Sequence, residues 1–524
     1  EERGTVYFKS GEDRYYPEEL LAIVLNKSRA LAQDFAEQKV KDVVITVPAF
    51  FNQAERESVM YAAELADLKV LQLINDNAAV ALNYGVFRRN DFNATVQNIM
   101  FFDMGAGSTT ATIVSYQVVK TKEKGFSESN PHLFVKGVGF DRTLGGLEID
   151  LRLRDHLAKK FTEAGKTKNN VLDSPRAMAK LFKEANRVKK VLSANVDHMA
   201  QVEGVLDDVD LHTKVTRSEL EEMCADLFDR IAGPVEMALK ASEMTMGEID
   251  SVILVGGGTR VPKVQEKLLQ ATKKSELAKN INADEAAALG AVYQAAHLSK
   301  GFKVKKFVVK DANLYPIQVE FERLTTDDSG AEVKKVVRRT LFGRNNPFPQ
   351  KKVMTFNRHK SDFAFVVGYK DLETILPADE LNSFGPTNLT TYSLKGVGKA
   401  LKKQSDAEPK GIKAHFRLDD SGILHLDSVV SVFEKTETVL EEVNDTEEEQ
   451  STLQKLSSTI SRFFSGSSDD ETAEGKAPDS DTAVEENSDK DTSDKDTSDK
   501  DAGDKDASDK DASDKDASDK DTSD

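Results

Sequence analysis

The chain of 524 residues contains a single cysteine, Cys224, and no tryptophan. A single thiol excludes an internal disulfide framework and a zinc site built from several cysteines. Leu220, Met223 and Leu227 surround Cys224 at helical spacing, which predicts a buried and unreactive thiol. Long apolar runs are missing as well, because none approaches the roughly 20 residues that cross a bilayer. We therefore expect no membrane span.

Net charge is also small once the C-terminal tail is set apart. The whole chain carries −18, but residues 468–524 hold 23 acidic and 8 basic side chains, which leaves only −3 for the rest. A nearly neutral folded part argues against a nucleic-acid partner. From Asn487 the tail repeats Ser-Asp-Lys-Asp-Ala/Thr without any large apolar side chain. This composition predicts a disordered, solvated spacer, with weak calcium buffering as the alternative.

The start of the chain, Glu-Glu-Arg, lacks both an initiator methionine and an apolar signal segment. Such a start is typical of a fragment. Four Asn-x-Ser/Thr sequons are candidate glycosylation sites and permit a secretory compartment. They lie at Asn26, Asn93, Asn388 and Asn444.

Apolar periodicity predicts an α/β domain over residues 1–302. Its first part alternates between helices and strands, with expected bounds of 17–37, 43–47, 52–68, 70–74 and 77–84. A mostly helical block follows, with helices expected at 147–163, 175–193 and 217–242. A buried strand at 251–255 precedes two further helices, one from Val261 and one at 284–297.

Composition changes after residue 302. The short basic segment 303–311 is a predicted interdomain linker, and residues 312–434 alternate between apolar and polar side chains with period two. This alternation predicts an antiparallel β domain. Residues 435–524 form an acidic loop and tail, with a short amphipathic helix at 451–464 and the repeats at 487–524. That helix is either docked on the folded part or a contact for a client or a membrane surface.

The segment from Ile99 to Val114 reads as a strand, a glycine-rich turn and a second strand. Gly105 and Gly107 would let the backbone approach a phosphate, and Asp103 at the strand end could hold metal-bound water. Tight hairpins also use glycine without any ligand. The turn by itself is therefore weak support for a nucleotide site.

Three glycine-marked segments stand in order along the chain: FDMGAGST (102–109), GFDRTLGGLEID (139–150) and ILVGGGTRVPKVQ (253–265). With the helix KEANRVKKVLSAN (183–195) they resemble the two-lobed arrangement of the actin-like ATPases. Residues 44–85 and INADEAAALGAVYQAA (281–296) resemble the seventy-kilodalton heat shock protein family, and within it the large members of the endoplasmic reticulum lumen. The resemblance implies an actin-like bilobed ATPase domain, then an antiparallel β-sandwich that binds substrate.

The resemblance also implies ATP or ADP and Mg²⁺ as cofactors and a set of site residues. Asp103 and Asp76 would be catalytic, and Asp103 would hold magnesium through water. The phosphate contacts would be Gly105, Gly107, Ser108, Thr109, Gly145 and Gly146. The nucleoside contacts would be Arg187, Lys189, Lys190, Ser193, Gly256, Gly257, Gly258, Arg260 and Asp284. Without the family resemblance, the cations on the helix are better interpreted as a solvated helix face. The glycines are then better interpreted as residues that helix and turn geometry requires.

Two departures from the family pattern argue against fast hydrolysis. Asn75-Asp76-Asn77-Ala78 stands where hydrolytic members have Asn-Glu-Pro-Thr, and Thr110 replaces an aspartate. A carboxylate displaced by about an ångström costs on the order of a hundredfold in rate. The family's first phosphate loop would lie upstream of residue 1. We therefore expect a weak ATPase at most and none in the chain as given, which should bind ATP weakly or not at all.

The resemblance implies a stress-response chaperone of the endoplasmic reticulum lumen. It would hold unfolded polypeptides and act as a nucleotide exchange factor for the conventional lumenal heat shock chaperone. The alternative is a self-sufficient, ATP-hydrolysing foldase of the same family. A sugar kinase on the actin-like fold would leave the β domain unexplained, and a calcium buffer would explain only the tail.

Overall fold

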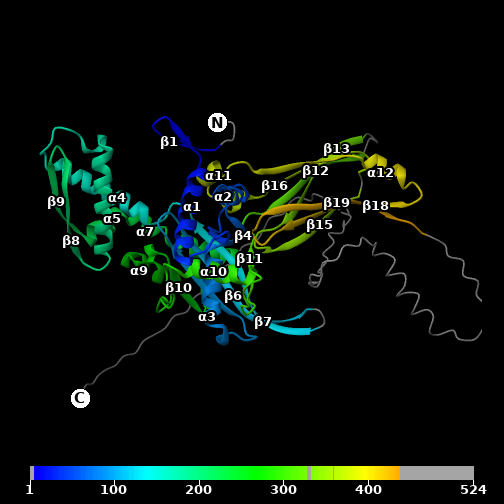
Figure 1. Ribbon diagram of the computed structural model, residues 1–524, viewed down its shortest axis with the longest axis horizontal. Helices are drawn as coiled ribbons and strands as arrows, with labels where there is room; N and C mark the ends of the chain where they lie inside the picture. Colours follow the sequence, from blue (N-terminus) through cyan, green and yellow to red (C-terminus); the bar gives the residue numbers. More distant parts are fainter. Residues whose placement is uncertain (1–4, 124–125, 327–331, 358, 437–524) are drawn as a thin grey trace, which may run out of the picture. The chain divides into compact units, whose positions relative to one another are not determined.

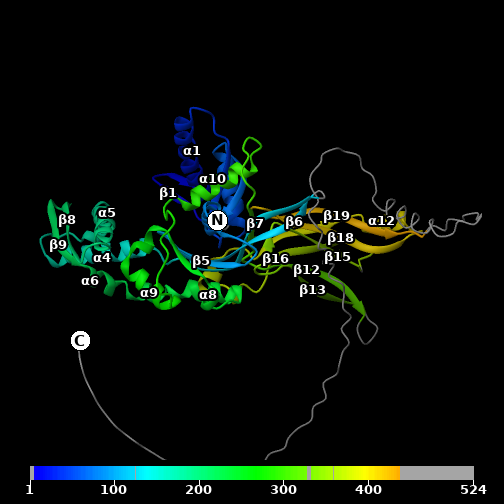
Figure 2. The ribbon, with the colours of Figure 1, turned by 90° about the horizontal axis from the view of Figure 1, so that it is seen from below.

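The computed structural model describes residues 5–123, 126–326, 332–357 and 359–436, which belong to one compact unit, Glu1–Thr482. The predicted tail, the helix at 451–464 and Asn444 lie outside these residues. Among the helices in the described ranges, none is both long enough and apolar enough to cross a membrane. Figure 1 shows the arrangement of the elements and Figure 2 gives a second view.

A six-stranded sheet forms the centre of the α/β domain. Its strand order is β10-β5-β6-β7-β11-β14, with bounds Ser251–Val255, Gln97–Met104, Thr109–Glu123, Phe126–Asp141, Val308–Ala312 and Pro347–Phe348. Side chains of β5 alternate between two cores, because Met100 and Phe102 point into one and Ile99 and Phe101 into the other. Helix α3 (Asp76–Phe87) packs on one side of the sheet and α8 (Ala232–Ser242) on the other. The four consecutive residues 99–102 of β5 are therefore all apolar, as a strand buried on both faces requires.

The first part of the chain forms the predicted helix and strand alternation. Strands β1 (Phe8–Ser10) and β2 (Asp13–Tyr15) pair as a small hairpin before α1 (Pro17–Ala36). Strands β3 (Asp42–Val47) and β4 (Lys69–Asn75) pair in parallel, with α2 (Gln53–Leu65) between them in sequence. Asn52 caps α2 through a capping box with Glu55, which fixes where this helix begins.

The block at 147–242 differs from the expected run of helices. Helices α4 (Gly146–Glu163) and α5 (Pro175–Leu192) are present, but a hairpin of β8 (Asp197–Leu206) and β9 (Val209–Thr216) follows them. Both views show this hairpin beside α5 (Figures 1 and 2). The single helix expected at 217–242 was wrong. It is divided into α6 (Arg217–Met223), α7 (Ala225–Asp229) and α8. Pro234 has no N–H to donate to the carbonyl of Arg230, which accounts for the break before α8.

Two further helices complete the α/β domain, α9 (Pro262–Thr272) and α10 (Ala286–Leu298). Helix α10 packs on α3. Short 3₁₀ turns connect elements at Arg89–Asp91, Val171–Asp173, Met246–Glu248, Gly257–Arg260 and Leu372–Thr374.

The β part is a sandwich of two antiparallel sheets. One has the order β13-β12-β16-β17, with bounds Glu332–Phe342, Ile317–Thr326, Phe363–Tyr369 and Asn388–Leu394. The other has the order β15-β18-β19, with bounds Gln350–Phe356, Glu408–Leu418 and Leu424–Glu434. Short helices α11 (Ala378–Ser383) and α12 (Val397–Lys403) join strands. Phe356 contacts Phe321 and Phe365, and Phe365 contacts Phe416, so aromatic rings fill the space between the sheets.

The expected linker, 303–311, connects the two parts as an ordered element. Its second half forms β11, which pairs in parallel with β7 and antiparallel with β14. Phe307 is 3% exposed and contacts Phe92 and Tyr116. The apolar side chains of the segment are therefore part of the core of the α/β domain.

Candidate functional site

The glycine turn between β5 and β6 is the centre of the candidate site. The backbone N–H of Gly105 donates to the carbonyl of Ser108 at 3.0 Å, which closes the turn. A Cβ on Gly107 would meet nothing within 4 Å, so open space lies above this turn. Thr109 is buried, and its hydroxyl donates to the carbonyl of Leu144 at 2.7 Å. The turn thus has room for a phosphate and is tied at its base to the second glycine segment.

The second glycine segment lies directly against this turn. Gly146 N–H donates to Gly105 O at 3.0 Å, and Leu147 N–H donates to Ala106 O at 2.8 Å. A Cβ on Gly145 would overlap the carbonyl of Ala106. Only a glycine permits this approach, because the two backbones are in contact at that point.

The third glycine segment follows β10 and closes the other side. Gly256 has a positive φ of 79°, and a Cβ there would overlap a carboxylate oxygen of Asp103 and the carbonyl of Met104. Its N–H donates to Ala283 O at 3.3 Å, which brings in the loop that carries Asp284. Asp284 accepts a hydrogen bond from Arg260 at 2.5 Å, and both side chains are about 60% exposed. The three segments, far apart in sequence, therefore meet around Asp103.

Two partly buried carboxyl groups lie at the base of the site. Burial raises the pKa of Asp76 to about 6, against a hydrogen bond from Thr46 and the charge of Arg56. Burial and the nearby Asp76 raise the pKa of Asp103 to about 7. Thr110 stands opposite Asp103 in the β5–β6 ladder, and Asn77 donates to Thr112 at 3.1 Å. A divalent cation would offset the repulsion between the two carboxylates, so this donor set fits hydrated Mg²⁺.

The predicted nucleoside residues on α5 separate into two groups. Lys189 is 13% exposed, and its Nζ donates to Gly146 O and to a carboxylate oxygen of Asp150, both at 2.8 Å. Lys189 therefore holds the second glycine segment in place. Arg187 instead pairs with Glu184, which also accepts Gln201 N–H from β8. Arg187 thus lies away from the glycine turns, because residues two apart on a helix face in different directions.

The other two predicted residues of α5 remain near Lys189 in the chain. Ser193 donates to Lys189 O at 3.1 Å, and Lys190 is exposed.

The three sequons within the described residues, at Asn26, Asn93 and Asn388, have exposed asparagines.

Comparison with known proteins now identifies the family. The model described as Hsp70 protein matches residues 1–524. The chain belongs to the Hsp70 family. It is 62% identical over 482 residues to hypoxia up-regulated protein 1 of zebrafish, covering 92% of the chain and 48% of that relative. It is 61% identical to the Xenopus laevis protein of the same name, over 93% of the chain and 74% of the relative.

The human protein of that name is 59% identical over 93% of the chain and 48% of its own length. The chain thus spans about half the length of the zebrafish and human relatives. Membership of the Hsp70 family confirms the actin-like ATPase fold, and it implies that the glycine turns around Asp103 belong to a nucleotide-binding domain.

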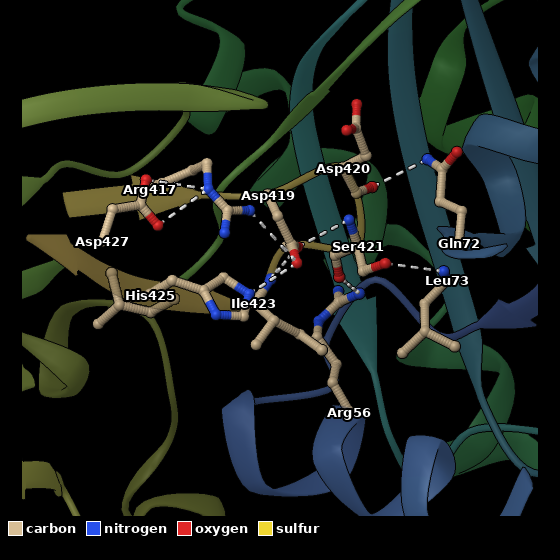
Figure 3. Close-up of polar contacts among 12 residues, drawn as sticks. Arg56, Gln72, Leu73, Arg417, Asp419, Asp420, Ser421, Ile423, His425 and Asp427 are labelled. Atoms are coloured by element: carbon tan, nitrogen blue, oxygen red, sulfur yellow. Dashed lines mark hydrogen bonds and ion pairs between the residues drawn. The ribbon is translucent and has the colours of Figure 1, made fainter. Parts of the chain in front are cut away.

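A second polar cluster, which the sequence analysis missed, joins the α/β domain to the sandwich. The turn after β18, residues 419–423, reaches β4 and α2 (Figure 3). Arg56 donates to Ser421 O at 3.1 Å and to Asn75 Oδ1 at 2.7 Å. Gln72 donates to Asp420 O at 2.9 Å. Arg56 thus binds both domains at once.

Gln53 makes a matched pair of hydrogen bonds to the same turn. Its Nε2 donates to Gly422 O at 2.7 Å, and its Oε1 accepts Leu424 N–H at 2.9 Å. Its own backbone N–H donates to the hydroxyl of Tyr369 at 2.8 Å. The only local signal was the polar first turn of α2, where Gln53 and Arg56 are three residues apart on one face.

Burial shapes the electrostatics of this cluster. It lowers the pKa of Arg56 while the charge of Asp311 opposes that shift. It raises the pKa of Asp311 to about 6, against its hydrogen bonds to Ala312 and Asn75 and the charge of Arg56. The buried cation and the buried carboxyl therefore depend on each other, and each would be costly to bury alone.

Proposed function

We propose that the protein is a chaperone of the endoplasmic reticulum lumen. It holds unfolded polypeptides, binds ATP with little hydrolysis, and acts as a nucleotide exchange factor for the conventional lumenal heat shock chaperone. Its ATPase domain spans 1–302, its linker 303–311 and its substrate-binding sandwich 312–434. The exposed sequons at Asn26, Asn93 and Asn388 support the lumenal location.

The composition of the carboxyl cluster carries the proposal of slow hydrolysis. Asp76 lies close enough to Asp103 to raise the pKa of Asp103 further after burial, which supports a hydrated metal ion between them. Across the ladder from Asp103 stands Thr110, a neutral side chain. A site with one acidic group fewer binds a metal–nucleotide complex but stabilises less of the charge that develops during phosphoryl transfer.

The sandwich supports the client-holding part of the proposal. Strand β13 is at the edge of its sheet, and Val333 and Val336 on it are 44% and 48% exposed. An edge strand with exposed apolar side chains can add an extended polypeptide through backbone hydrogen bonds.

The test is the rate of ADP release from the conventional lumenal chaperone, measured with a fluorescent ADP in the presence and absence of this chain. We expect acceleration that grows with chain concentration. Unchanged release would overturn the exchange-factor proposal. Aggregation of a denatured reporter enzyme, followed by light scattering, tests client holding separately.

A single-turnover ATPase measurement distinguishes the proposal from a self-sufficient foldase. At an ATP concentration that saturates the site, we expect hydrolysis by this chain to be far slower than by the conventional chaperone. Thr110→Asp restores the acidic group and should speed hydrolysis if the missing charge is the cause. Hydrolysis by the unmodified chain as fast as that of the conventional chaperone would favour the foldase.

A further inference from the structure

A cavity of about 190 Å³ lies along β11 and is separate from the candidate nucleotide site. Residues 306–311 form one wall. The other walls come from β4, α10, β14 and the turn after β18, through side chains that include Gln72, Gln294, Leu298 and Phe348. Gln294 donates to Gln72 at 2.9 Å, so these two amides are fixed.

The edge of β11 that borders this cavity is incompletely paired. Strand β11 pairs with β7 through residues 308–310 on one side, and on the other side with β14 only at Asp311 and Ala312. Within the described ranges, no strand therefore pairs with the second edge of residues 308–310. An extended strand directs alternate backbone N–H and C=O groups to each edge. This edge can accept another strand.

The size of the cavity limits its occupant. Sites for whole small molecules usually measure about 300 to 1,000 Å³, whereas this cavity is about 190 Å³. It is too small for a nucleotide but suits one or two side chains. An occupant would therefore be anchored mainly by the strand edge, with a side chain inserted.

The charges around the cavity favour an acidic occupant. Lys306, Lys310 and His297 line it. The two lysines also act on His132 of the neighbouring strand β7. Burial lowers the pKa of His132 most, and the positive charges of Lys310 and Lys306 lower it further. The carboxyl of Asp311 is engaged with Ala312 N–H and lies in the field of Arg56. Asp420 is the remaining acidic residue of the lining, and Lys310 partly offsets its charge.

We propose that the open edge of β11 binds a short, extended acidic peptide segment by strand addition, with one side chain in the cavity between Leu298 and Lys310. This site differs from the nucleotide site and from the edge of β13, and it does not depend on the proposed exchange activity. A peptide here would contact both domains, because the cavity is lined by the α/β domain and the sandwich.

The probe is a fluorescein-labelled Glu-Val-Glu-Val-Glu peptide, followed by fluorescence anisotropy with the intact chain. We expect binding that is about tenfold tighter than that of the matching Gln-Val-Gln-Val-Gln peptide, and that weakens as salt rises from about 50 to about 300 mM. Hydrogen exchange should slow at residues 308–310 when the peptide is bound. Equal affinity for the two peptides, or no change in exchange at β11, would overturn the proposal.

Variants locate the site. Leu298→Trp fills the cavity from a side chain that is 42% exposed, and Lys310→Glu reverses a lining charge. Each should weaken the acidic peptide by about tenfold or more. Lys303→Glu changes the charge of the same segment by the same amount, but Lys303 does not line the cavity. The affinity of this variant for the acidic peptide should therefore stay within about twofold of that of the unmodified chain. Binding that survives Leu298→Trp, as binding at the β13 edge would, contradicts the assignment.

Discussion

The candidate nucleotide site and the contact between domains are built in different ways. Around Asp103, three glycine segments touch through their backbones, as where Gly146 N–H meets Gly105 O at 3.0 Å. Between the domains, side chains of α2 and β4 bind backbone groups of the turn at 419–423, as where Arg56 donates to Ser421 O. The first assembly depends on the absence of side chains, and the second on long polar ones. An added side chain should therefore destabilise the first assembly, and a removed side chain should destabilise the second.

Arg56→Ala should have the largest effect. It would leave Asn75, the carbonyl of Ser421 and the buried carboxyl of Asp311 without their cation. A hydrogen bond to a charged group contributes about 1.5–3 kcal/mol, so losing the two to Ser421 and Asn75 should cost about 3–6 kcal/mol. Urea unfolding should show this loss, while Arg154→Ala, which removes an exposed pair with Asp155, should change stability by less than about 0.5 kcal/mol. Equal effects would mean that the domain contact does not form in solution.

Gly145→Ala tests the other assembly and should have the next largest effect. The added methyl group would overlap the carbonyl of Ala106, and overpacking of this kind costs about 1–3 kcal/mol. Gly107→Ala is the matched control in the same site, because its Cβ would meet nothing within 4 Å. It should be neutral or slightly stabilising. Thermal unfolding of the two variants measures the difference in stability. Similar losses of stability would show that the close approach of the two backbones at Gly145 does not explain the effect of Gly145→Ala.

Asp311→Asn should remove a pH dependence from the domain contact. The pKa of Asp311 is raised to about 6 in the folded chain, above its ordinary value near 3.9. The native state therefore binds this proton between about pH 4 and pH 6 while the unfolded chain has released it, so this contribution to stability is lost as pH rises.

Lowering the pH from 7 to 5 should thus stabilise the unmodified chain by about 1 kcal/mol more than the Asp311→Asn variant. Urea unfolding at both pH values measures the difference. The opposite sign would mean that the carboxylate form is the one favoured beside Arg56.

Local sequence patterns predict many of the helices and strands correctly, but they predict few of the contacts between distant segments. The helix expected at 17–37 is α1, because Pro17 in the first turn and a regular apolar stripe are sufficient local signals. The β8–β9 hairpin was missed, although Asp207 and Asp208, both with positive φ, form a typical hairpin turn. Few residues of its strands are buried, and so their apolar alternation is weak.

The contact between domains could not be read from local patterns at all. Arg56 and Ser421 are 365 residues apart, and the polar first turn of α2 resembles any solvated helix start. The glycine segments were recognisable only together, because each alone is compatible with an ordinary turn. Lys189 was expected beside a nucleoside, and only the three-dimensional structure reveals its hydrogen bond to Gly146.

The smallest expected effect is on stability and concerns the contacts of Asp419 and His425, which hold the turn at 419–423 that Arg56 binds. Asp419 Oδ1 accepts the N–H groups of Ser421 and Ile423 at 2.9 and 2.8 Å, while its Oδ2 contacts His425 at 2.8 Å (Figure 3). His425 is 40% exposed, so water competes for its contact with Asp419 and His425→Gln should cost less than about 0.5 kcal/mol.

Asp419→Ala removes both backbone acceptors and should cost about 1–2 kcal/mol, as the loss of a helix cap does. Urea unfolding of the two variants, at one pH, compares the contributions directly. A loss for His425→Gln as large as that for Asp419→Ala would mean that the surrounding charges, rather than backbone hydrogen bonds, hold the turn in the shape that Arg56 and Gln53 recognise.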